Sequence, residues 1–425
     1  MAELLVRGGE VVDAGGRRRA DVLVADGVVR MVGESLEAPS GATVLDAGGC
    51  VVAPGLVDLH THLRQPGREE AETVESGARA AALGGYTAVV AMPNTEPPLD
   101  SAGAVREVLA LGRLAAVEVA VAGAITVGRA GERLAPMAEL AALGVRIFTD
   151  DGDGVQDGAL MRRALDYARG LGVTLAEHCE DERLAAGAAM HEGPWSSRLG
   201  IPGAPSAAEE VMVARDVALA RLTGGRLHLC HLSTAGSMDL VRRAKAEGLA
   251  VTAEVTPHHL VLTHAAVAGF DPVFRVNPPL RGDDDVAAAR AALADGTVDA
   301  IATDHAPHAP EAKDVPFAEA PPGVLGLETA LSVALGVAPL ERVLALMSWQ
   351  PAAVAGLGDR HGGPVVEGRP ANLCVVDPAA RWKVDAGALA SLSRNTPFDC
   401  WELTGRVRHT VRDGVAVVVD AEAVR

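Results

Sequence analysis

The sequence of 425 residues contains few lysines, cysteines and aromatic residues. Only three of its 38 basic residues are lysines (Lys245, Lys313 and Lys383), and aromatic residues make up 3% of the chain. The five cysteines form no Cys-x-x-Cys pair, which argues against a disulfide framework and indicates reduced, structural thiols. No apolar run reaches the roughly 18 residues of a membrane span. The first residues contain no signal-peptide core, so we expect a cytoplasmic protein.

The sequence also lacks any run of basic residues. With 38 basic and 56 acidic side chains the formal charge is −18, which argues against a nucleic-acid or anionic-membrane surface. Hydrophobic residues make up 49% of the chain and no low-complexity tract interrupts them, so intrinsic disorder is excluded as the main state. The length suits two or three domains, or one large barrel with an additional module.

Both ends of the chain alternate polar and apolar residues as β-strands do. We expect strands at residues 4–12, 20–25, 28–32 and 42–46, and again at 371–377, 406–411 and 415–419. Asp26-Gly27 and Asp413-Gly414 follow such runs, and each pair is typical of a two-residue hairpin turn. Neither end has enough strands to close a core alone. The sequence therefore predicts one small β-sandwich built from residues 1–53 and 361–425.

Residues 54–360 have a different pattern, in which eight short apolar runs alternate with stretches of helical period. The runs are Gly55–His62, Tyr86–Asn94, Val117–Ile125, Val145–Asp151, Thr174–Glu180, Arg226–Ser233, Ala250–Pro257 and Asp299–His308. Eight strand–helix repeats are typical of a (β/α)8 TIM barrel. A doubly wound open sheet would alternate similarly, but no G-x-G-x-x-G or P-loop supports nucleotide binding. We therefore predict an α/β chain with a barrel inserted into the sandwich.

The apolar runs become polar at their C-terminal ends, where barrel active sites lie. These ends carry Asp58, His60, His62, Asn94, Asp150, Asp151, His178, His231 and Asp304. His60 and His62 are two residues apart, so they project from the same face of a strand, as two ligands of one metal must. Imidazoles together with carboxylates suit Zn²⁺ or a similar divalent ion. The sequence predicts a metal site at this rim.

Strand alternation also sorts the neighbouring residues. Cys179 and Cys230 are adjacent to rim histidines, so we expect both to face the helices as packing residues, and His228 has the same parity. His258 and His259 follow the seventh run and could line the mouth of the barrel, but we expect them to be solvated loop residues.

Seven motifs together resemble those of one enzyme family. They are Asp58-Leu-His-Thr-His-Leu-Arg-Gln-Pro-Gly67, Met92-Pro-Asn-Thr95, Thr149-Asp-Asp-Gly152, Glu177-His-Cys-Glu180, His231-Leu-Ser233, Val276-Asn-Pro-Pro-Leu-Arg281 and Thr303-Asp-His-Ala-Pro-His308. They are similar to the dihydroorotases, and more narrowly to the bacterial type I branch within the amidohydrolase superfamily. The resemblance runs nearly end to end and includes Ser393-Arg-Asn-Thr-Pro397. Several of these motifs recur in related cyclic amidases.

The positions of the lysines distinguish between branches of that superfamily. Many of them bridge two metals with a carboxylated lysine after the fourth strand, but here the first lysine is Lys245, and none lies between His62 and His178. This absence counts against hydantoinase-like and dihydropyrimidinase-like relatives. Asp150-Asp151 occupies the required position, and the resemblance implies that Asp151 is the bridging ligand. A turn with helix-capping carboxylates is the alternative interpretation of this pair.

The resemblance implies reversible cyclisation of N-carbamoyl-L-aspartate to L-dihydroorotate, a step of pyrimidine synthesis. It implies one or two Zn²⁺ per chain in a site whose ligands are His60, His62, Asp151, His178, His231 and Asp304. Asp304 would also act as the general base. The implied substrate contacts are His62, Arg64, Asn94, Asn277, His308 and the backbone of Pro322 and Gly323. A guanidinium fork suits the substrate carboxylate, although a surface ion pair is the alternative for Arg64 and a turn residue for Asn94.

Two other functions remain open at this point. One is a different cyclic amidohydrolase, of the allantoinase or hydantoinase kind. The other is a catalytically silent partner of aspartate carbamoyltransferase, which the complete ligand set counts against. Association with that transferase, or a homodimer, is compatible with activity, and we expect the substrate to be a small molecule with a carboxylate.

Overall fold

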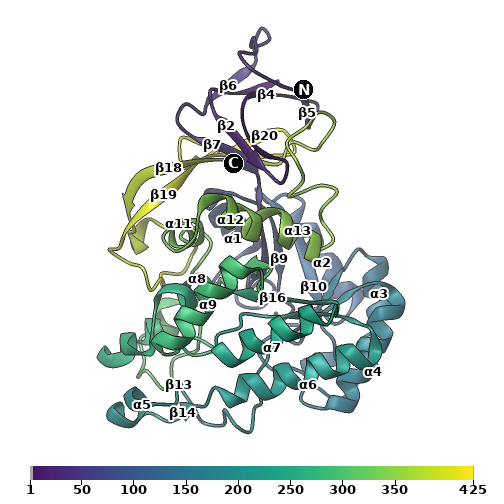
Figure 1. Cartoon of the computed structure of the whole chain (residues 1–425), viewed down its shortest axis with the longest axis vertical. Helices are drawn as coiled ribbons and strands as arrows, with labels where there is room; N and C mark the ends of the chain where they lie inside the picture. The colour runs from purple at the N-terminus through teal and green to yellow at the C-terminus, as the bar shows by residue number, and fades with distance from the viewer. Residues whose placement is uncertain (1–2, 425) are drawn as a thin grey trace.

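The protein has a barrel and a β-sandwich, which lie one above the other in Figure 1. This computed structural model describes residues 3–424. The two ends of the chain, purple and yellow, meet in the upper part, and the blue to green middle of the chain forms the lower part.

Eight parallel strands form the barrel. They are β8 (Leu56–Thr61), β9 (Tyr86–Ala91), β10 (Glu118–Gly123), β11 (Ile147–Phe148), β12 (Thr174–Glu177), β15 (Arg226–Leu229), β16 (Val251–Val255) and β17 (Ala300–Ile301). Neighbours in the chain pair with each other in this order. Each of the eight predicted runs contains one of these strands, and the predicted fold class is confirmed.

The barrel closes between its first and last strands. A parallel bridge joins Thr61 to His305. Below it, Asp58 accepts hydrogen bonds from the Thr303 backbone N–H (2.8 Å), the Thr303 hydroxyl (2.6 Å) and the Thr61 hydroxyl (2.5 Å). Asp58 is fully buried, and this burial raises its pKa to about 6. One buried carboxyl group therefore joins the two strands that carry the two ends of the barrel.

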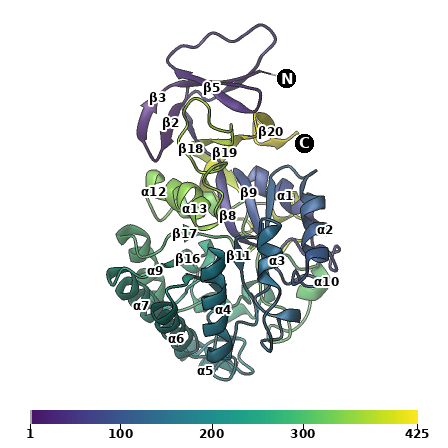
Figure 2. The same ribbon diagram turned by 90° about the vertical axis from the view of Figure 1, so that its right-hand side faces the viewer.

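One helix follows each barrel strand and packs outside it, as Figure 2 shows for several of them. In chain order these helices are α1 (Val74–Leu83), α2 (Ala102–Gly112), α3 (Met137–Ala142), α4 (Gly158–Leu171), α6 (Ala207–Thr223), α7 (Ala235–Ala246), α9 (Asp283–Asp295) and α11 (Ala330–Leu335). The shorter elements are the strand pair β13 (Met190–His191) and β14 (Gly203–Ala204), and the helices α5 (Pro194–Leu199), α8 (Pro257–Val261), α10 (Pro310–Lys313), α12 (Leu340–Leu344) and α13 (Gln350–Val354).

Helix α4 shows how the sequence forms this outer layer. It begins at Asp157, whose carboxylate accepts the backbone N–H groups of Ala159 and Leu160, and it ends at Gly172 in the left-handed conformation. Its buried residues are Leu160, Met161, Ala164, Leu165 and Ala168, which recur at helical spacing. The remaining face is polar, so only one side of the helix can pack on the barrel.

The sandwich has two sheets. The first contains, in spatial order, β5 (Val28–Gly33), β4 (Asp21–Ala25), β1 (Leu4–Arg7) and β6 (Thr43–Asp46). The second contains β21 (Glu422–Ala423), β20 (Val415–Val419), β19 (Glu402–Arg412), β18 (Leu373–Lys383), β7 (Val51–Pro54), β2 (Glu10–Asp13) and β3 (Gly16–Arg19). Strand β7 pairs with β18, so the second sheet joins the two ends of the chain. The core between the two sheets is formed by buried side chains such as Leu4, Val22, Val52 and Val375.

Three predicted strands are wrong in extent. Strands β18 and β19 extend beyond the predicted residues 371–377 and 406–411. Residues 4–12 form two strands, because Gly8 (φ 83°) turns the chain and β1 and β2 then join different sheets. Both predicted hairpin turns are confirmed: Asp26-Gly27 links β4 to β5 and Asp413-Gly414 links β19 to β20, each with two positive φ angles. The division of the chain at residues 53/54 and 360/361 stays a prediction.

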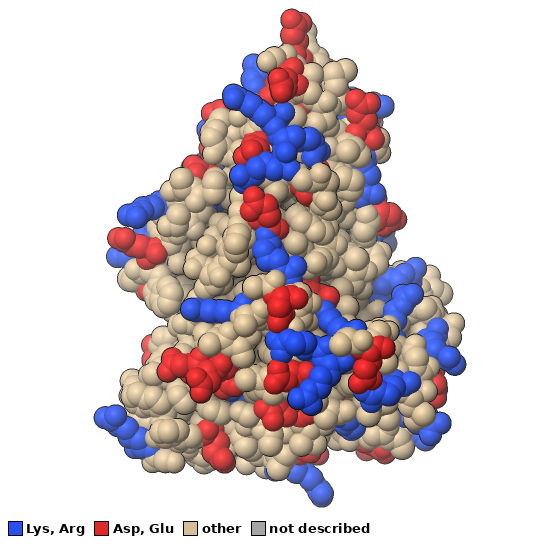
Figure 3. Space-filling view, in the orientation of Figure 1, with Lys and Arg blue, Asp and Glu red and all other residues tan. Residues whose placement is uncertain are grey.

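Across residues 3–424, no helix is both long enough and apolar enough to cross a bilayer. On the face drawn in Figure 3, basic and acidic side chains are interspersed.

Candidate active site and metal centre

The six predicted metal ligands lie together at the C-terminal ends of the barrel strands. His60 and His62 come from β8 and the residues after it, Asp151 follows β11, His178 follows β12, His231 follows β15 and Asp304 follows β17. Each is at most 7% exposed. The structure therefore brings together side chains that are up to 244 positions apart in the chain (304 − 60).

Asp151 lies at the centre of this group. Its Oδ1 is 3.2 Å from His60 Nε2, 3.5 Å from His231 Nε2 and 3.8 Å from His178 Nδ1. Its Oδ2 is 3.6 Å from His62 Nε2. Two sets of converging ligand atoms result, one with His60 and His62 and the other with His178 and His231, and Asp151 belongs to both.

Asp304 lies beside the first of these sets. Its Oδ1 is 3.0 Å from His62 Nε2 and 3.6 Å from His60 Nε2. The backbone of Asp304 has a φ of 46°, and His231 and Arg64 also have positive φ angles of 33° and 59°. Non-glycine residues rarely adopt this region, and such strain is concentrated at functional sites.

The electrostatics of the group fit a divalent cation. Burial opposes charge on His60, but the facing carboxylates of Asp151 and Asp304 raise its pKa well above the ordinary value. Burial likewise opposes charge on Asp151, yet His60 and His231 hold its pKa well below the ordinary value. Within residues 3–424, His60 Nε2 and Asp151 Oδ1 have no hydrogen-bond partner although both are buried. A bound cation would satisfy both atoms, and imidazole with carboxylate is a donor set that suits zinc-like ions.

Asp150 points away from this centre. Its Oδ1 accepts the backbone N–H groups of Ile125 (2.8 Å) and Thr126 (3.0 Å), and its Oδ2 accepts the Thr126 hydroxyl. The two consecutive carboxylates thus have different surroundings. Asp150 fixes the loop after β10, and Asp151 faces the histidines.

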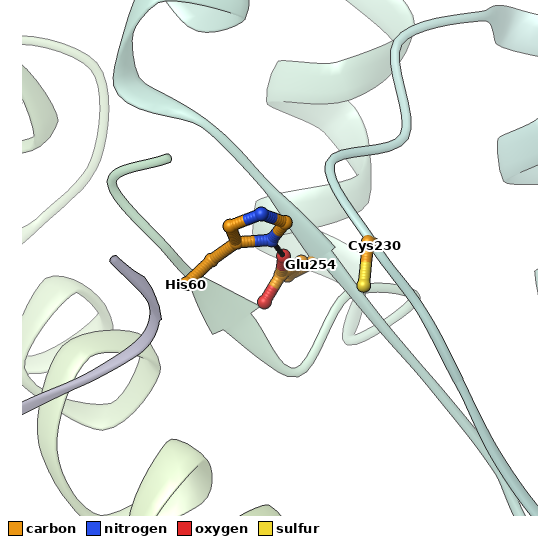
Figure 4. A group of neighbouring side chains, drawn as sticks. All are labelled: His60, Cys230 and Glu254. Atoms are coloured by element: carbon orange, nitrogen blue, oxygen red, sulfur yellow. Dashed lines mark hydrogen bonds and ion pairs between the residues drawn. The ribbon is translucent and has the colours of Figure 1, made fainter. Parts of the chain in front are cut away.

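Glu254, which the sequence analysis did not select, lies behind His60. It is a buried residue of β16, and its Oε1 accepts a hydrogen bond from His60 Nδ1 at 2.9 Å, shown in Figure 4. Its Oε2 lies 3.0 Å from His228 Nε2, and Oε1 also accepts the His231 backbone N–H at 3.3 Å. Burial opposes charge on Glu254, but the bonds from His228 and His60 lower its pKa to about 2. The ionised carboxylate therefore holds a proton on His60 Nδ1, so that Nε2 is the nitrogen that would bind a metal ion.

The expected orientations of His228 and Cys230 are wrong. Both face the barrel interior, where His228 reaches Glu254 and Cys230 lies beside His60 and Glu254 (Figure 4). Strand β15 ends at Leu229, and the positive φ of His231 breaks the alternation on which the expectation rested. Burial raises the pKa of the Cys230 thiol, so it is a protonated packing residue.

His62 has its own supporting residue. Its Nδ1 lies 2.9 Å from the amide oxygen of Asn94, which accepts the Nδ1 proton. Asn94, predicted as a substrate contact, thus also orients His62 in the same way that Glu254 orients His60.

Arg64 and His308 lie beside the metal centre. Arg64 is 8% exposed, and its Nε donates to the Pro307 carbonyl at 3.0 Å. Its two terminal nitrogens form no hydrogen bond within residues 3–424. Burial lowers the pKa of Arg64 to about 10, so it stays charged at neutral pH. Burial and the nearby Arg64 lower the pKa of His308 to about 3. Neutral His308 donates from Nε2 to the Pro322 carbonyl at 2.8 Å.

The other predicted substrate contacts lie on two loops. Asn277 Nδ2 is 3.3 Å from His178 Nε2. The Gly323 N–H donates to the Arg275 carbonyl at 2.9 Å, and the Gly323 carbonyl accepts from Asn395, which the sequence analysis noted only within a motif. The Gly323 N–H is therefore already used, while its carbonyl keeps a second lone pair. Gly323 has a φ of 137°, and a Cβ there would lie 2.6 Å from Ala306 Cβ.

We expected His258 and His259 to be solvated loop residues, and this prediction is wrong. Helix α8 begins directly after β16, and Thr256 caps it, so both side chains are buried. His259 lies 3.0 Å from the Pro278 carbonyl, and His258 Nε2 has no hydrogen-bond partner among the described residues.

The chain is similar to known proteins over most of its length. A family model described as "Dihydro-orotase-like" matches residues 49–237. The dihydroorotase of Streptomyces coelicolor is 50% identical over 431 residues, covering 99% of this chain and 100% of that protein. The dihydroorotase of Mycobacterium tuberculosis is 50% identical over 428 residues, covering 99% of each.

Solved structures show the same fold. The L-hydantoinase from Arthrobacter aurescens matches with a TM-score of 0.90 at 26% identity, covering 100% of this chain and 98% of that one. The D-hydantoinase from a Thermus species matches with a TM-score of 0.85 at 25% identity, covering 99% and 96%. Because half of the residues are identical to those of dihydroorotases over nearly the full length of both chains, this chain belongs to the dihydroorotase family of metal-dependent cyclic amide hydrolases.

Proposed function

We propose that this enzyme interconverts N-carbamoyl-L-aspartate and L-dihydroorotate at a site for two Zn²⁺ ions. The observation that carries the proposal is the position of Asp151, a buried carboxylate shared by two pairs of histidines beside a buried arginine. An acidic residue there, in a chain whose first lysine is Lys245, supports dihydroorotase over the hydantoinase alternative.

The ligands divide between two ions. His60, His62 and Asp304 would hold one, His178 and His231 the other, and Asp151 both. Bound divalent ions would lower the pKa of a water from 15.7 to about 7 and would polarise the ring amide.

Asp304 moves the proton. In the hydrolytic direction its carboxylate takes a proton from the attacking water and passes it to the leaving ring nitrogen. The nearby imidazoles of His60 and His62 lower the pKa of Asp304 despite its burial, so the carboxylate starts deprotonated and ready to accept.

The substrate carboxylate would bind beside the metals. The free terminal nitrogens of Arg64 form a fork that suits a carboxylate, with His62, Asn94 and neutral His308 as further contacts. Asn277 and the carbonyls of Pro322 and Gly323 would contact the ring amides.

We also propose a cytoplasmic homodimer that can associate with aspartate carbamoyltransferase. All five cysteines are free, which suits a reducing compartment. Light scattering of the protein alone and with the transferase tests both assemblies.

A substrate comparison tests the proposal. Zinc-loaded protein is assayed for hydrolysis of dihydroorotate, dihydrouracil, hydantoin and allantoin. We expect dihydroorotate to be preferred by at least about 100-fold in kcat/KM, because the alternatives lack the carboxylate that Arg64 binds. A preference for any other ring would contradict the proposal.

A further inference from the structure

Lys313 ends the short helix α10, visible in Figure 2, and reaches across to a neighbouring loop. Its Nζ donates to the carbonyls of Pro272 (3.1 Å), Arg275 (3.3 Å) and Pro321 (2.8 Å). Burial and the nearby Arg275 lower the pKa of Lys313 to about 7. In its charged form the amino group has three N–H donors, and all three are used. Lys313 therefore lies in a fixed position, unlike the exposed Lys383.

Arg275 makes the reverse connection. Its Nη1 donates to the carbonyls of Phe317 and Ala318, which belong to the segment that Lys313 comes from. The Arg275 carbonyl accepts both from Lys313 and from the Gly323 N–H at 2.9 Å. Segments 272–277 and 310–323 are thus linked twice. Lys313 of the second segment donates to backbone carbonyls of the first, and Arg275 of the first donates to backbone carbonyls of the second. We call the two cations and these acceptors the clasp.

The two segments carry predicted substrate contacts. Asn277 is two residues after Arg275, and Gly323 is two residues after Pro321. Arg275, Asn277 and Pro322 line one cavity of about 100 Å³, together with Glu180. Both loops therefore contribute to the lining of this cavity.

We propose that Lys313 and Arg275 are positioning residues that set the affinity for the substrate ring by fixing the distance between Asn277 and the Pro322-Gly323 backbone. This inference rests on the proposed function. Neither cation contacts a metal ligand in the described structure, so the clasp acts on substrate binding and not on the metal centre.

The first test separates KM from kcat. Lys313→Met removes all three bonds and keeps most of the side-chain volume. We expect the KM for dihydroorotate to rise at least about tenfold, as for the loss of hydrogen bonds from a charged group, with kcat changed less than about threefold and zinc content unchanged. Lys313→Arg should restore part of the affinity because it keeps charged donors. Lys383→Met is the matched control and should behave as the wild type. An unchanged KM in Lys313→Met, or an equal loss of kcat, would overturn the proposal.

The second test uses the reciprocity of the clasp. Because both cations hold the same two segments, Lys313→Met combined with Arg275→Met should raise KM by less than the product of the single effects. Multiplicative effects would mean that the two residues act independently, against the proposal.

Hydrogen exchange tests the clasp without any substrate. Amides of residues 310–323 should exchange faster in Lys313→Met than in the wild type or Lys383→Met. Unchanged exchange would refute the clasp whatever the enzyme's substrate is. If exchange rises but the wild type does not hydrolyse dihydroorotate, the proposed function fails while the clasp stands as a structural device.

Discussion

Replacement of Glu254 by glutamine tests whether the hydrogen bond to Nδ1 of His60 orients this metal ligand. Glu254 accepts three hydrogen bonds, from His60 Nδ1 (2.9 Å), His228 Nε2 (3.0 Å) and the His231 N–H (3.3 Å). Glutamine has nearly the same shape but only one acceptor oxygen. One of the two imidazoles must then face an amide N–H₂ group, and where that imidazole is His60 its proton moves to Nε2, the atom that faces Asp151.

The expected loss of metal affinity follows from the competition of His60 and His228 for the one remaining acceptor oxygen. Loss of a group that orients a metal-binding histidine typically lowers metal affinity 10–100-fold, or about 1.4–2.8 kcal/mol. We expect Glu254→Gln to fall in this range, and Glu254→Asp to lose affinity as well because the shorter side chain cannot reach both rings. Global stability should change less in Glu254→Gln than metal affinity does.

The assay is competition for zinc between metal-free protein and a chelator of known affinity. Glu118→Gln is the matched control, because Glu118 also accepts from a histidine, His361 at 2.9 Å, but lies at the start of β10 far from the carboxyl ends of the strands. Glu118→Gln should bind zinc as the wild type does. If Glu254→Gln did the same, the orientation argument for His60 would be wrong.

Three further predictions concern other residues. Asp151→Ala should lose one ion and nearly all turnover, whereas Asp150→Ala should keep both ions, and zinc alone should reactivate metal-free wild type without bicarbonate because no lysine lies between His62 and His178; metal analysis showing the reverse order of the two variants would move the bridge to Asp150. Arg64→Lys keeps the charge but loses the fork, so KM should rise by a factor equivalent to about 1.5–3 kcal/mol, and unchanged kinetics would mean that another group binds the carboxylate. Asp13 accepts hydrogen bonds from Arg18 (2.9 Å) and the Val365 N–H (2.8 Å), which lower its pKa although burial opposes this. Its carboxylate therefore stabilises the fold above the ordinary carboxyl pKa near 3.8, and this contribution is lost as the pH falls through the lower folded value. Urea unfolding should show Asp13→Asn to be less stable at pH 7 by about 1.5–3 kcal/mol, with the difference vanishing in acid; a difference independent of pH would contradict this reasoning.

The sequence predicted those parts of the site that depend on where strands end. His60, Asp151 and Asp304 follow apolar runs, and in a barrel the carboxyl ends of all strands meet at one rim. Parity failed for His228 because β15 has only four residues and His231 leaves the strand with a positive φ. Glu254 stayed unselected because a polar residue within a strand has no local signal that identifies its partner on another strand.

The contacts between the loops could not be predicted from the sequence. Lys313 and Arg275 bind backbone carbonyls, and any residue type supplies a carbonyl, so no sequence pattern could have identified their partners. The contacts of Asn395 with Ala306 and Gly323 are of the same kind.

The closure of the barrel has a consequence for folding. His62 and Asp304 are 242 residues apart and follow the first and last strands of the barrel, which are joined through Asp58 and Thr303. A chain with an open barrel therefore has the ligands from the middle strands but lacks the pair that His62 and Asp304 form. Ions that bind only the closed form shift the equilibrium toward it by mass action. We therefore expect tight zinc binding to appear late in folding, only after the first and last strands of the barrel have paired.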